Sequence, residues 1–246
     1  MRSESQISAP ILGRVAPRNF HSQVIWTLGV SIVGGHYPEG AILPGDAELQ
    51  KLQGVSRTVV REALKTLAAK GLIEARTRVG TRVRPRQDWN LFDADVLAWH
   101  FEAGADMEFL GSLAEMRQAI EPEAAAHAAL RRTPEQVETL LDWAERMSDP
   151  ANTAEIFARF DLEFHRAVAD ASGNPFMRSI SALVELALMA SFTLSSPVAD
   201  PVAFERSVAV HRAIATFIRD GDAEGARAAM RQAIEEGYER TIGTFG

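Results

Sequence analysis

The sequence predicts a mainly α-helical protein that combines an N-terminal winged helix-turn-helix domain with a C-terminal all-α antiparallel helical bundle. Three observations predict this fold class. Residues 1–86 carry 13 Lys and Arg against 6 Asp and Glu, whereas residues 87–246 carry 13 against 27. Two short segments around a glycine turn close the basic part and predict a β-hairpin. Apolar residues at helical spacing fill the acidic part.

The chain divides where the basic residues stop. Pro85 and Arg86 end the basic part, and long helical patterns follow them. A basic domain joined to an acidic one indicates a head that binds a polyanion, with nucleic acid as the leading candidate. We predict a flexible arm at 1–17, the winged helix-turn-helix domain at 18–86, a linker and junction helix at 87–103, and the all-helical domain at 104–243.

Composition excludes several classes of protein. With 46% hydrophobic and 24% charged residues, a chain of 246 residues should fold into one large or two modest domains. It contains no cysteine, which excludes disulfides, thiol nucleophiles and cysteine-type zinc fingers and fits a cytoplasmic protein. The first residues are polar and the most apolar stretch contains Glu185, so we expect neither secretion nor a membrane span.

The head begins with helices. The first is predicted at 20–33, before a pair of glycines. A short helix at about 47–53 follows, with Asp46 as its N-cap. The second helix of the helix-turn-helix begins after Ser56, a further N-cap, and ends at Gly71.

This second helix has one apolar and one basic face. Its apolar stripe predicts a side packed on the core, made by Val60, Ala63, Leu64 and Leu67. Helix geometry puts the polar residues on the opposite side: Arg57, Thr58, Arg61 and Lys65. A major groove admits a helix, so we expect Arg57 and Arg61 to contact bases and Thr58 and Ser56 to contact phosphate. A solvated charged face is the alternative.

A basic hairpin follows that helix. Residues 72–77 and 81–84 are predicted strands, joined by Arg78-Val79-Gly80. Arg76, Arg78 and Arg82 surround the tip, where they can follow the DNA backbone or enter a minor groove. Gly80 would let the tip approach closely. The hairpin completes a winged helix-turn-helix.

The rest of the chain is predicted to be helical. Pro122 should break or kink one long helix near Glu121. Thr133-Pro134-Glu135-Gln136 is a strong helix start, with threonine as N-cap and glutamine at N3. We expect helices at 93–101, 108–132, 134–148, 153–171, 175–195, 202–220 and 223–242.

The head resembles a known family. Gly40-Ala41-Ile42-Leu43-Pro44, the segment 54–64 and Gly71-Leu72-Ile73 are similar to the DNA-binding head of GntR-family bacterial transcription regulators, over about 30–86. The resemblance implies a homodimer that reads a pseudo-palindromic double-stranded DNA operator. By position it assigns DNA contacts to Arg57, Thr58, Arg61 and Gly80. Ala47 departs from it, because many members carry an operator-touching arginine there.

Three residues of the body have the chemistry of metal ligands. Asp161 and His165 lie four residues apart, so both project from one face of a helix. His211 lies on the inward stripe of a later helix, where an unpaired imidazole is costly. From spacing alone, a surface pair and a satisfied core histidine are the commoner interpretations, and a metal site is the alternative.

The body resembles the helical C-terminal (FCD) domain of the FadR subfamily, over about 105–240. The resemblance rests on the residues around Arg117, the Asp161/His165 pair, residues 172–175 and the segment after His211. Many such domains bind a divalent metal through one Asp and three His, and the fourth position here is Ala233. The resemblance thus implies either a three-ligand site for zinc, nickel or manganese or direct effector binding by the same residues.

The resemblance also implies an effector. Arg117 matches an arginine that faces the pocket in relatives, which implies a bidentate contact with an effector carboxylate; an ion pair with Glu121 or another acid is the alternative. The segment 89–99 resembles the junction of regulators of sugar-acid catabolism. The expected effector is therefore a small hydroxylated carboxylate, a sugar acid or a related organic acid.

The sequence thus predicts a DNA-binding transcription regulator, a repressor released by a carboxylate effector, and not an enzyme. Two alternatives stay open. One is a metal-dependent hydrolase with Asp161, His165 and His211 as ligands, although no nucleophile elbow, phosphate loop or His-Glu-x-x-His motif accompanies them. The other is a DNA-bound protein without a small ligand, which Ala233 leaves open.

Overall fold

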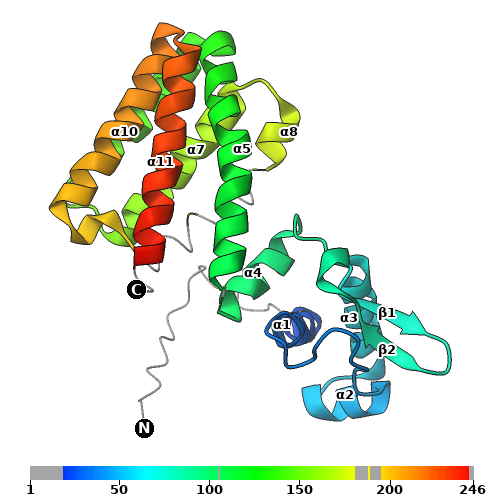
Figure 1. Ribbon diagram of the computed structural model, residues 1–246. Coiled ribbons are helices and arrows are strands. Elements are labelled where there is room, and N and C mark those ends of the chain that lie inside the picture. Colours follow the sequence, from blue (N-terminus) through cyan, green and yellow to red (C-terminus); the bar gives the residue numbers. More distant parts are fainter. Residues whose placement is uncertain (1–18, 105, 181–187, 189–194, 244–246) are drawn as a thin grey trace. The chain divides into compact units, whose positions relative to one another are not determined.

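The chain folds into two compact units, residues 1–105 and 106–246. The computed structural model describes residues 19–104, 106–180, 188 and 195–243 (Figure 1). The first unit contains helices and a two-stranded antiparallel sheet, and the described part of the second contains helices alone. The predicted fold class, a mainly α protein with a β-hairpin wing and a helical C-terminal domain, is confirmed.

Cap residues set the helix boundaries of the first unit. Ser56 caps α3 as predicted, because its hydroxyl accepts the backbone N–H of Val59. The predicted cap of α2 is wrong: Asp46 is the first helical residue and Gly45 holds the N-cap position without a side-chain hydrogen bond. The elements of this unit are α1 (Phe20–Val33), α2 (Asp46–Gln53), α3 (Arg57–Ala69), β1 (Ile73–Arg76), β2 (Gly80–Val83), the 3-10 turn η1 (Arg86–Asp88) and α4 (Ala94–Glu102).

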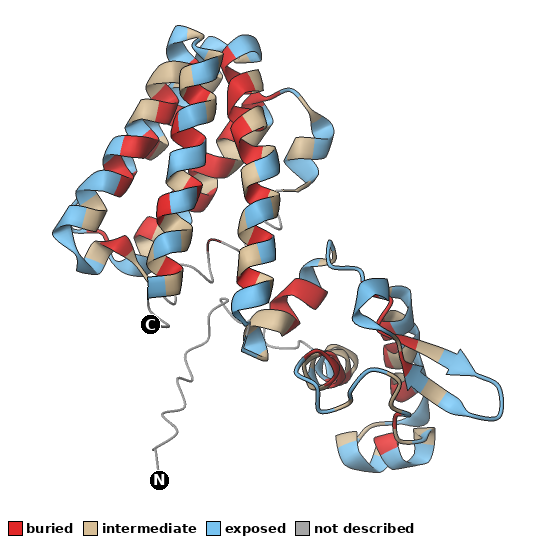
Figure 2. Cartoon of the chain, in the orientation of Figure 1, coloured by how far each residue is buried: buried red, intermediate tan, exposed pale blue. Residues whose placement is uncertain are grey.

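The wing is anchored on both sides of β2. One side pairs with β1, with Ile73 opposite Val83. On the other side Leu43 donates its N–H to Thr81, while Val83 donates to Ala41. β1 is shorter than the predicted 72–77, whereas β2 has the predicted length of four residues but begins at Gly80 instead of residue 81. These bonds hold the base of the hairpin and leave its tip exposed (Figure 2).

The core of the first unit extends beyond residue 86, where we placed the end of the head. Trp89, Val96 and Trp99 belong to the same buried cluster as Leu49 and Leu67. The indole N–H of Trp89 donates to the Arg84 carbonyl at 3.0 Å. Helix α4 packs on α1. Part of the segment that we assigned to a linker therefore stabilises the DNA-binding unit.

The second unit is a bundle in which α5 packs against α11 and α7. Of the break or kink expected at Pro122, the break is wrong, because α5 runs through Pro122 as one helix. Proline removes one N–H donor from the helix, and burial of Pro122 and the neighbouring alanines against the other helices offsets that cost. The elements are α5 (Met107–Arg131), α6 (Pro134–Met147), α7 (Ala154–Ala171), α8 (Pro175–Ser179), η2 (Pro197–Ala199), α10 (Pro201–Asp220) and α11 (Ala223–Gly243).

Local signals account for the ends of several of these helices. The capping box at the start of α6 is confirmed, with Thr133 and Gln136 bonding each other's backbone N–H. The helix predicted at 175–195 is wrong as one unbroken element, because α8 ends at Ser179, and most of the residues after it lie outside the described part of the chain. Gly221, in the left-handed conformation at φ +78°, ends α10.

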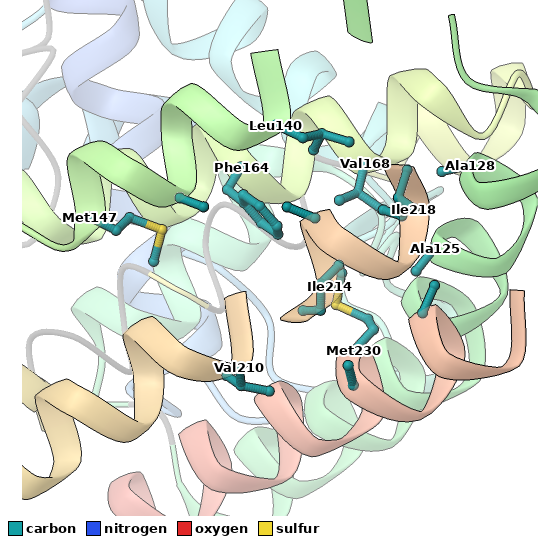
Figure 3. Packing of buried hydrophobic residues seen from close by; sticks show 14 of the residues in the cluster. Ala125, Ala128, Leu140, Met147, Phe164, Val168, Val210, Ile214, Ile218 and Met230 are labelled. Carbon is teal, nitrogen blue, oxygen red and sulfur yellow. The ribbon is translucent and has the colours of Figure 1, made fainter. Parts of the chain in front are cut away.

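Apolar residues from α5, α6, α7, α10 and α11 fill the centre of the bundle (Figure 3). Leu140 of α6, Phe164 of α7, Ile214 of α10 and Met230 of α11 are all fully buried. Small residues on α5, among them Ala125, let that helix approach closely. This packing fixes the faces of α5, α7 and α10 that carry the polar cluster described below.

Candidate DNA-reading face and ligand site

The polar face of α3 is turned to solvent. Val60, Ala63 and Leu67 are fully buried on the other side of the helix. The residues predicted to meet DNA are all exposed: Ser56, Arg57, Thr58, Arg61 and Lys65. The amphipathic pattern thus orients α3 as expected, while the DNA contacts themselves stay a prediction.

Weak surface contacts hold the cations of α3. Arg57 Nε lies 3.6 Å from the Asp46 carboxylate of α2, and Lys65 Nζ lies 2.8 Å from Glu62. Arg61 makes no ion pair with any residue that the structure describes. Exposed pairs of this kind contribute at most about 1 kcal/mol, so phosphate or base edges can replace them.

The arginines of the wing differ in their contacts with other residues of the protein. Arg76 pairs with Glu74 at 2.7 Å, and Arg82 Nε donates to the Gly40 carbonyl at 3.2 Å. Arg78 is exposed and adopts φ +63°, a left-handed conformation that is uncommon for a side chain with a Cβ. Gly80 has φ +117°, a backbone conformation that glycine adopts readily and residues with a Cβ rarely adopt, so the backbone alone accounts for a glycine at this position.

The second unit contains a buried polar cluster at the sequence-predicted positions. Asp161 and His165 of α7 and His211 of α10 lie together, with one possible ligand atom of each within 4.8 Å of the other two. Arg117 and Glu121 of α5 adjoin them, and all five residues are buried. The fold therefore brings together residues that are up to 94 positions apart in the sequence.

The hydrogen bond of His211 fixes its tautomer. Nδ1 lies 2.6 Å from the carbonyl oxygen of Ser207, which can only accept, so Nδ1 carries a proton. In the neutral ring Nε2 then presents a lone pair, 2.9 Å from Oδ1 of Asp161. A lone pair facing a carboxylate is unfavourable without a proton or a cation between them. A backbone carbonyl behind the ring is the usual support of a metal-binding histidine.

His165 has a similar arrangement, with a carboxylate behind the ring. Its Nδ1 lies 2.6 Å from Glu121 Oε2, and its Nε2 lies 3.9 Å from Asp161 Oδ2. These distances are short, but the approaches are poorly directed: His165 Nδ1, His211 Nε2 and Asp161 Oδ2 are buried without an aligned hydrogen bond. Buried polar atoms without partners are costly, and a divalent ion would satisfy those that face it.

The carboxylates of the cluster are ionised at neutral pH. Burial raises the pKa of Glu121, but the charges of Arg117 and His165 outweigh burial and lower the pKa to about 2. Burial likewise raises the pKa of Asp161, while His211, His165 and Arg117 lower it below its usual value. The cluster therefore offers one anionic oxygen and two imidazoles, a donor set that suits zinc, nickel or manganese. Ala233 offers no donor, so the described residues offer three possible ligands here.

Arg117 is engaged by Glu121 in this structure. Its Nε donates to Oε1 at 2.5 Å and its Nη2 donates to Oε2 at 3.3 Å. The ion pair that we named as the alternative is thus present, and an effector contact by Arg117 requires it to leave Glu121. Sequence reasoning did not place Glu121 at the centre, where it contacts both Arg117 and His165; its spacing of four residues from Arg117 was the available signal.

Two small hollows adjoin the cluster. One is lined mainly by apolar side chains, among them Val168 and Met230, and reaches Glu121 and His165. The other is lined by Arg117 together with residues of α5 and α11 such as Tyr238. Both are small in this structure.

The matches to family models agree with this division. Residues 21–83 match the model of the bacterial regulatory proteins of the gntR family, and residues 112–236 match the FCD domain. The chain belongs to the GntR family. It is a DNA-binding transcription regulator of the FadR type, with an FCD domain, and not an enzyme.

Relatives of this GntR-family regulator cover nearly its whole length. It is 36% identical over 215 residues to the uncharacterized HTH-type transcriptional regulator YieP of Escherichia coli, covering 85% of this chain and 90% of YieP. It is 31% identical over 222 residues to the galactonate operon transcriptional repressor of E. coli, covering 90% and 96%.

Two solved structures share the fold of this regulator. Lar, which controls expression of the Listeria monocytogenes agr system, is 18% identical with a TM-score of 0.60 and covers 92% of this chain and 97% of its own. E. coli McbR/YncC is 16% identical with a TM-score of 0.54 and covers 93% and 99%. Among the described residues, no helix is long and apolar enough to cross a membrane.

Proposed function

We propose that this regulator is a homodimeric repressor whose two heads bind a pseudo-palindromic operator and whose release depends on a small carboxylate. The exposed cationic face of α3, with Arg61 free of any ion pair within the described residues, is the observation that carries the DNA-reading part. The name of the galactonate repressor supports the sign of regulation and the class of effector. Symmetric half-sites require two heads, which supports the dimer.

The effector part of the proposal rests on the buried cluster of Asp161, His165 and His211. Their partnerless polar atoms support a bound divalent ion, and a three-ligand ion keeps a coordination position open for an effector oxygen. Direct effector binding by the same residues, without metal, is the alternative. In either case release requires the effector to bind the DNA-incompetent arrangement more tightly than the DNA-bound one.

A gel-shift titration tests the proposal. The full-length protein is mixed with DNA from upstream of its own gene and with a scrambled duplex of equal length, and aldonates and uronates are then added one at a time. We expect sequence-dependent binding that weakens steeply with salt, and release by at least one sugar acid. Equal affinity for both duplexes would refute operator reading. Tight operator binding that no carboxylate weakens would refute the effector part alone.

A further inference from the structure

One arginine of the second unit lacks the partners that its neighbours have. Arg240, on α11, has a buried Nε with no hydrogen-bond partner. It makes no ion pair with any residue in the described ranges. On the same helix Arg227 pairs with Glu123 at 2.7 Å. Arg240 as a whole is half-buried, and a buried guanidinium nitrogen without a hydrogen bond is costly, so its presence calls for an explanation.

The nearby carboxylates make their described contacts with other residues. Glu236 accepts from Arg206 and from Gln232, each at 2.9 Å. Asp161 is close enough for its charge to act on Arg240, but it is in contact with His211. Burial lowers the pKa of Arg240, and the attraction of Asp161 and Glu236 only partly offsets it. Among the residues that the structure describes, these carboxylates therefore attract Arg240 without forming a direct ion pair with it.

The position of Arg240 on α11 relates it to the ligand site. It follows Ala233 by seven residues, close to two full helical turns, so the two residues project from the same face. Ala233 stands where the resemblance places a fourth metal ligand. The face of α11 on which Ala233 offers no metal ligand thus carries the positive charge of Arg240.

We propose that Arg240 binds the carboxylate of the effector in the C-terminal domain. This inference rests on the proposed function, since it names the charge that recognises the effector class. Arg117 does not supply this charge, because Glu121 neutralises it with two hydrogen bonds. A small carboxylate would supply the anionic partner that Arg240 lacks among the described residues, and would bind the guanidinium through charge-assisted hydrogen bonds. The proposed ligand is a small organic acid whose carboxylate binds Arg240. A hydroxyl or second carboxylate oxygen next to that carboxylate would face Asp161, His165 and His211.

Stability without any ligand gives the first test. In Arg240→Met a flexible apolar side chain replaces the unpaired charge, so we expect a Tm equal to or above that of the wild type. Arg231→Met on the exposed side of the same helix is the matched control and should also leave the Tm unchanged. A Tm of Arg240→Met well below both would show that the arginine is structural and would overturn the inference.

Ligand response gives the second test, with sodium D-galactonate as the first probe and other aldonates and uronates after it. We expect one of these to raise the wild-type Tm, and its apparent affinity to fall about tenfold or more in Arg240→Met. Arg231→Met should keep the response. An unchanged affinity in Arg240→Met would refute the role of Arg240 alone. No response of the wild type to any of the acids would refute the carboxylate effector itself and, with it, this inference.

Discussion

The indole ring of Trp99 lies directly against the backbone of Gly29. A Cβ built on Gly29 would come within 2.4 Å of the ring, far inside van der Waals contact. Both residues are buried, so neither can turn away. Glycine inside a helix costs up to about 1 kcal/mol of stability relative to alanine. Here the missing side chain of Gly29 leaves room for the Trp99 ring, so α4 can pack on α1. The junction helix and the first helix of the head are therefore closely packed.

Gly29→Ala should destabilise the first unit, although alanine is the better helix former. The added methyl group must displace a fully buried ring, and overpacking of this kind costs about 1–3 kcal/mol. Thermal denaturation of the wild type and the variant measures the loss. In a chain that also carries Trp99→Leu, the cost of Gly29→Ala should largely disappear. Additive losses in the double variant would mean that the ring does not cause the strain.

Lys70 should make the stability of the head depend on alkaline pH. Its Nζ lies 2.7 Å from Asp93 and 2.8 Å from Asp95, which joins the end of α3 to the start of α4. Burial lowers the pKa of Lys70, but these two carboxylates raise it above its usual value of 10.5. A raised pKa means that the stabilisation is complete below 10.5 and is lost as pH rises through the folded-state pKa.

Lys70→Met tests this pH dependence of stability, because it removes the charge of Lys70. Its Tm should lie below that of the wild type by a constant amount from neutral pH to about 9, and the gap should close at higher pH as the lysine loses its proton. Circular dichroism melts in a pH series measure both proteins. A gap that persists unchanged above the folded-state pKa would show that the methylene packing of Lys70, and not its charge, is what stabilises the head.

Arg61→Ala should weaken operator binding by about 1–3 kcal/mol, or roughly 5- to 150-fold, and relax the preference at one base position. Its side chain is exposed and projects from the solvent side of α3, where a bidentate contact with guanine is possible. Fluorescence anisotropy with the operator and its single-base variants measures both effects.

Arg78→Ala provides the contrast to Arg61→Ala. If Arg78 contacts phosphate, its loss should weaken binding to all duplexes alike and reduce the slope of log affinity against log salt by about 0.9. The same slope in wild type and variant, together with a changed base preference, would assign Arg78 to base reading instead.

A divalent metal should stabilise the second unit through Asp161, His165 and His211. Addition of zinc, nickel or manganese at about a hundredfold excess over its Kd should stabilise the fold by about 2.7 kcal/mol, and chelator should reverse the effect. Elemental analysis of the purified protein gives the stoichiometry. Ala233→His, which restores a fourth possible ligand, should raise the affinity for the metal. A protein that neither contains nor responds to any of these ions would leave direct effector binding as the function of the cluster.

Much of the fold was predictable because its signals are local. Ser56 as an N-cap and the apolar stripe of α3 fixed both the start and the orientation of that helix. Pro122 does not break α5 because the packing of this helix against distant helices offsets a local penalty, and sequence spacing does not report such packing. Asp46 was misjudged by one position, because both it and Gly45 are acceptable at a helix start.

The ligand site was predictable only in part. The four-residue spacing of Asp161 and His165 and the inward position of His211 identified three members of the cluster. Within the described residues Arg240 has no ion pair because Glu236 contacts Arg206 and Asp161 contacts His211, and these are tertiary contacts that the sequence does not report. A sequence shows that an arginine is present but not that its charge is unmatched.

The tryptophans are divided unequally between the two units. Trp26, Trp89 and Trp99 contribute to the core of the DNA-binding unit, and Trp143 contributes to that of the helical domain. The intrinsic fluorescence of the protein is thus weighted towards the half that reads DNA. A chain in which Trp143 is replaced by phenylalanine would give an optical signal from that half alone, so the unfolding of the two halves could be followed separately without attaching a dye.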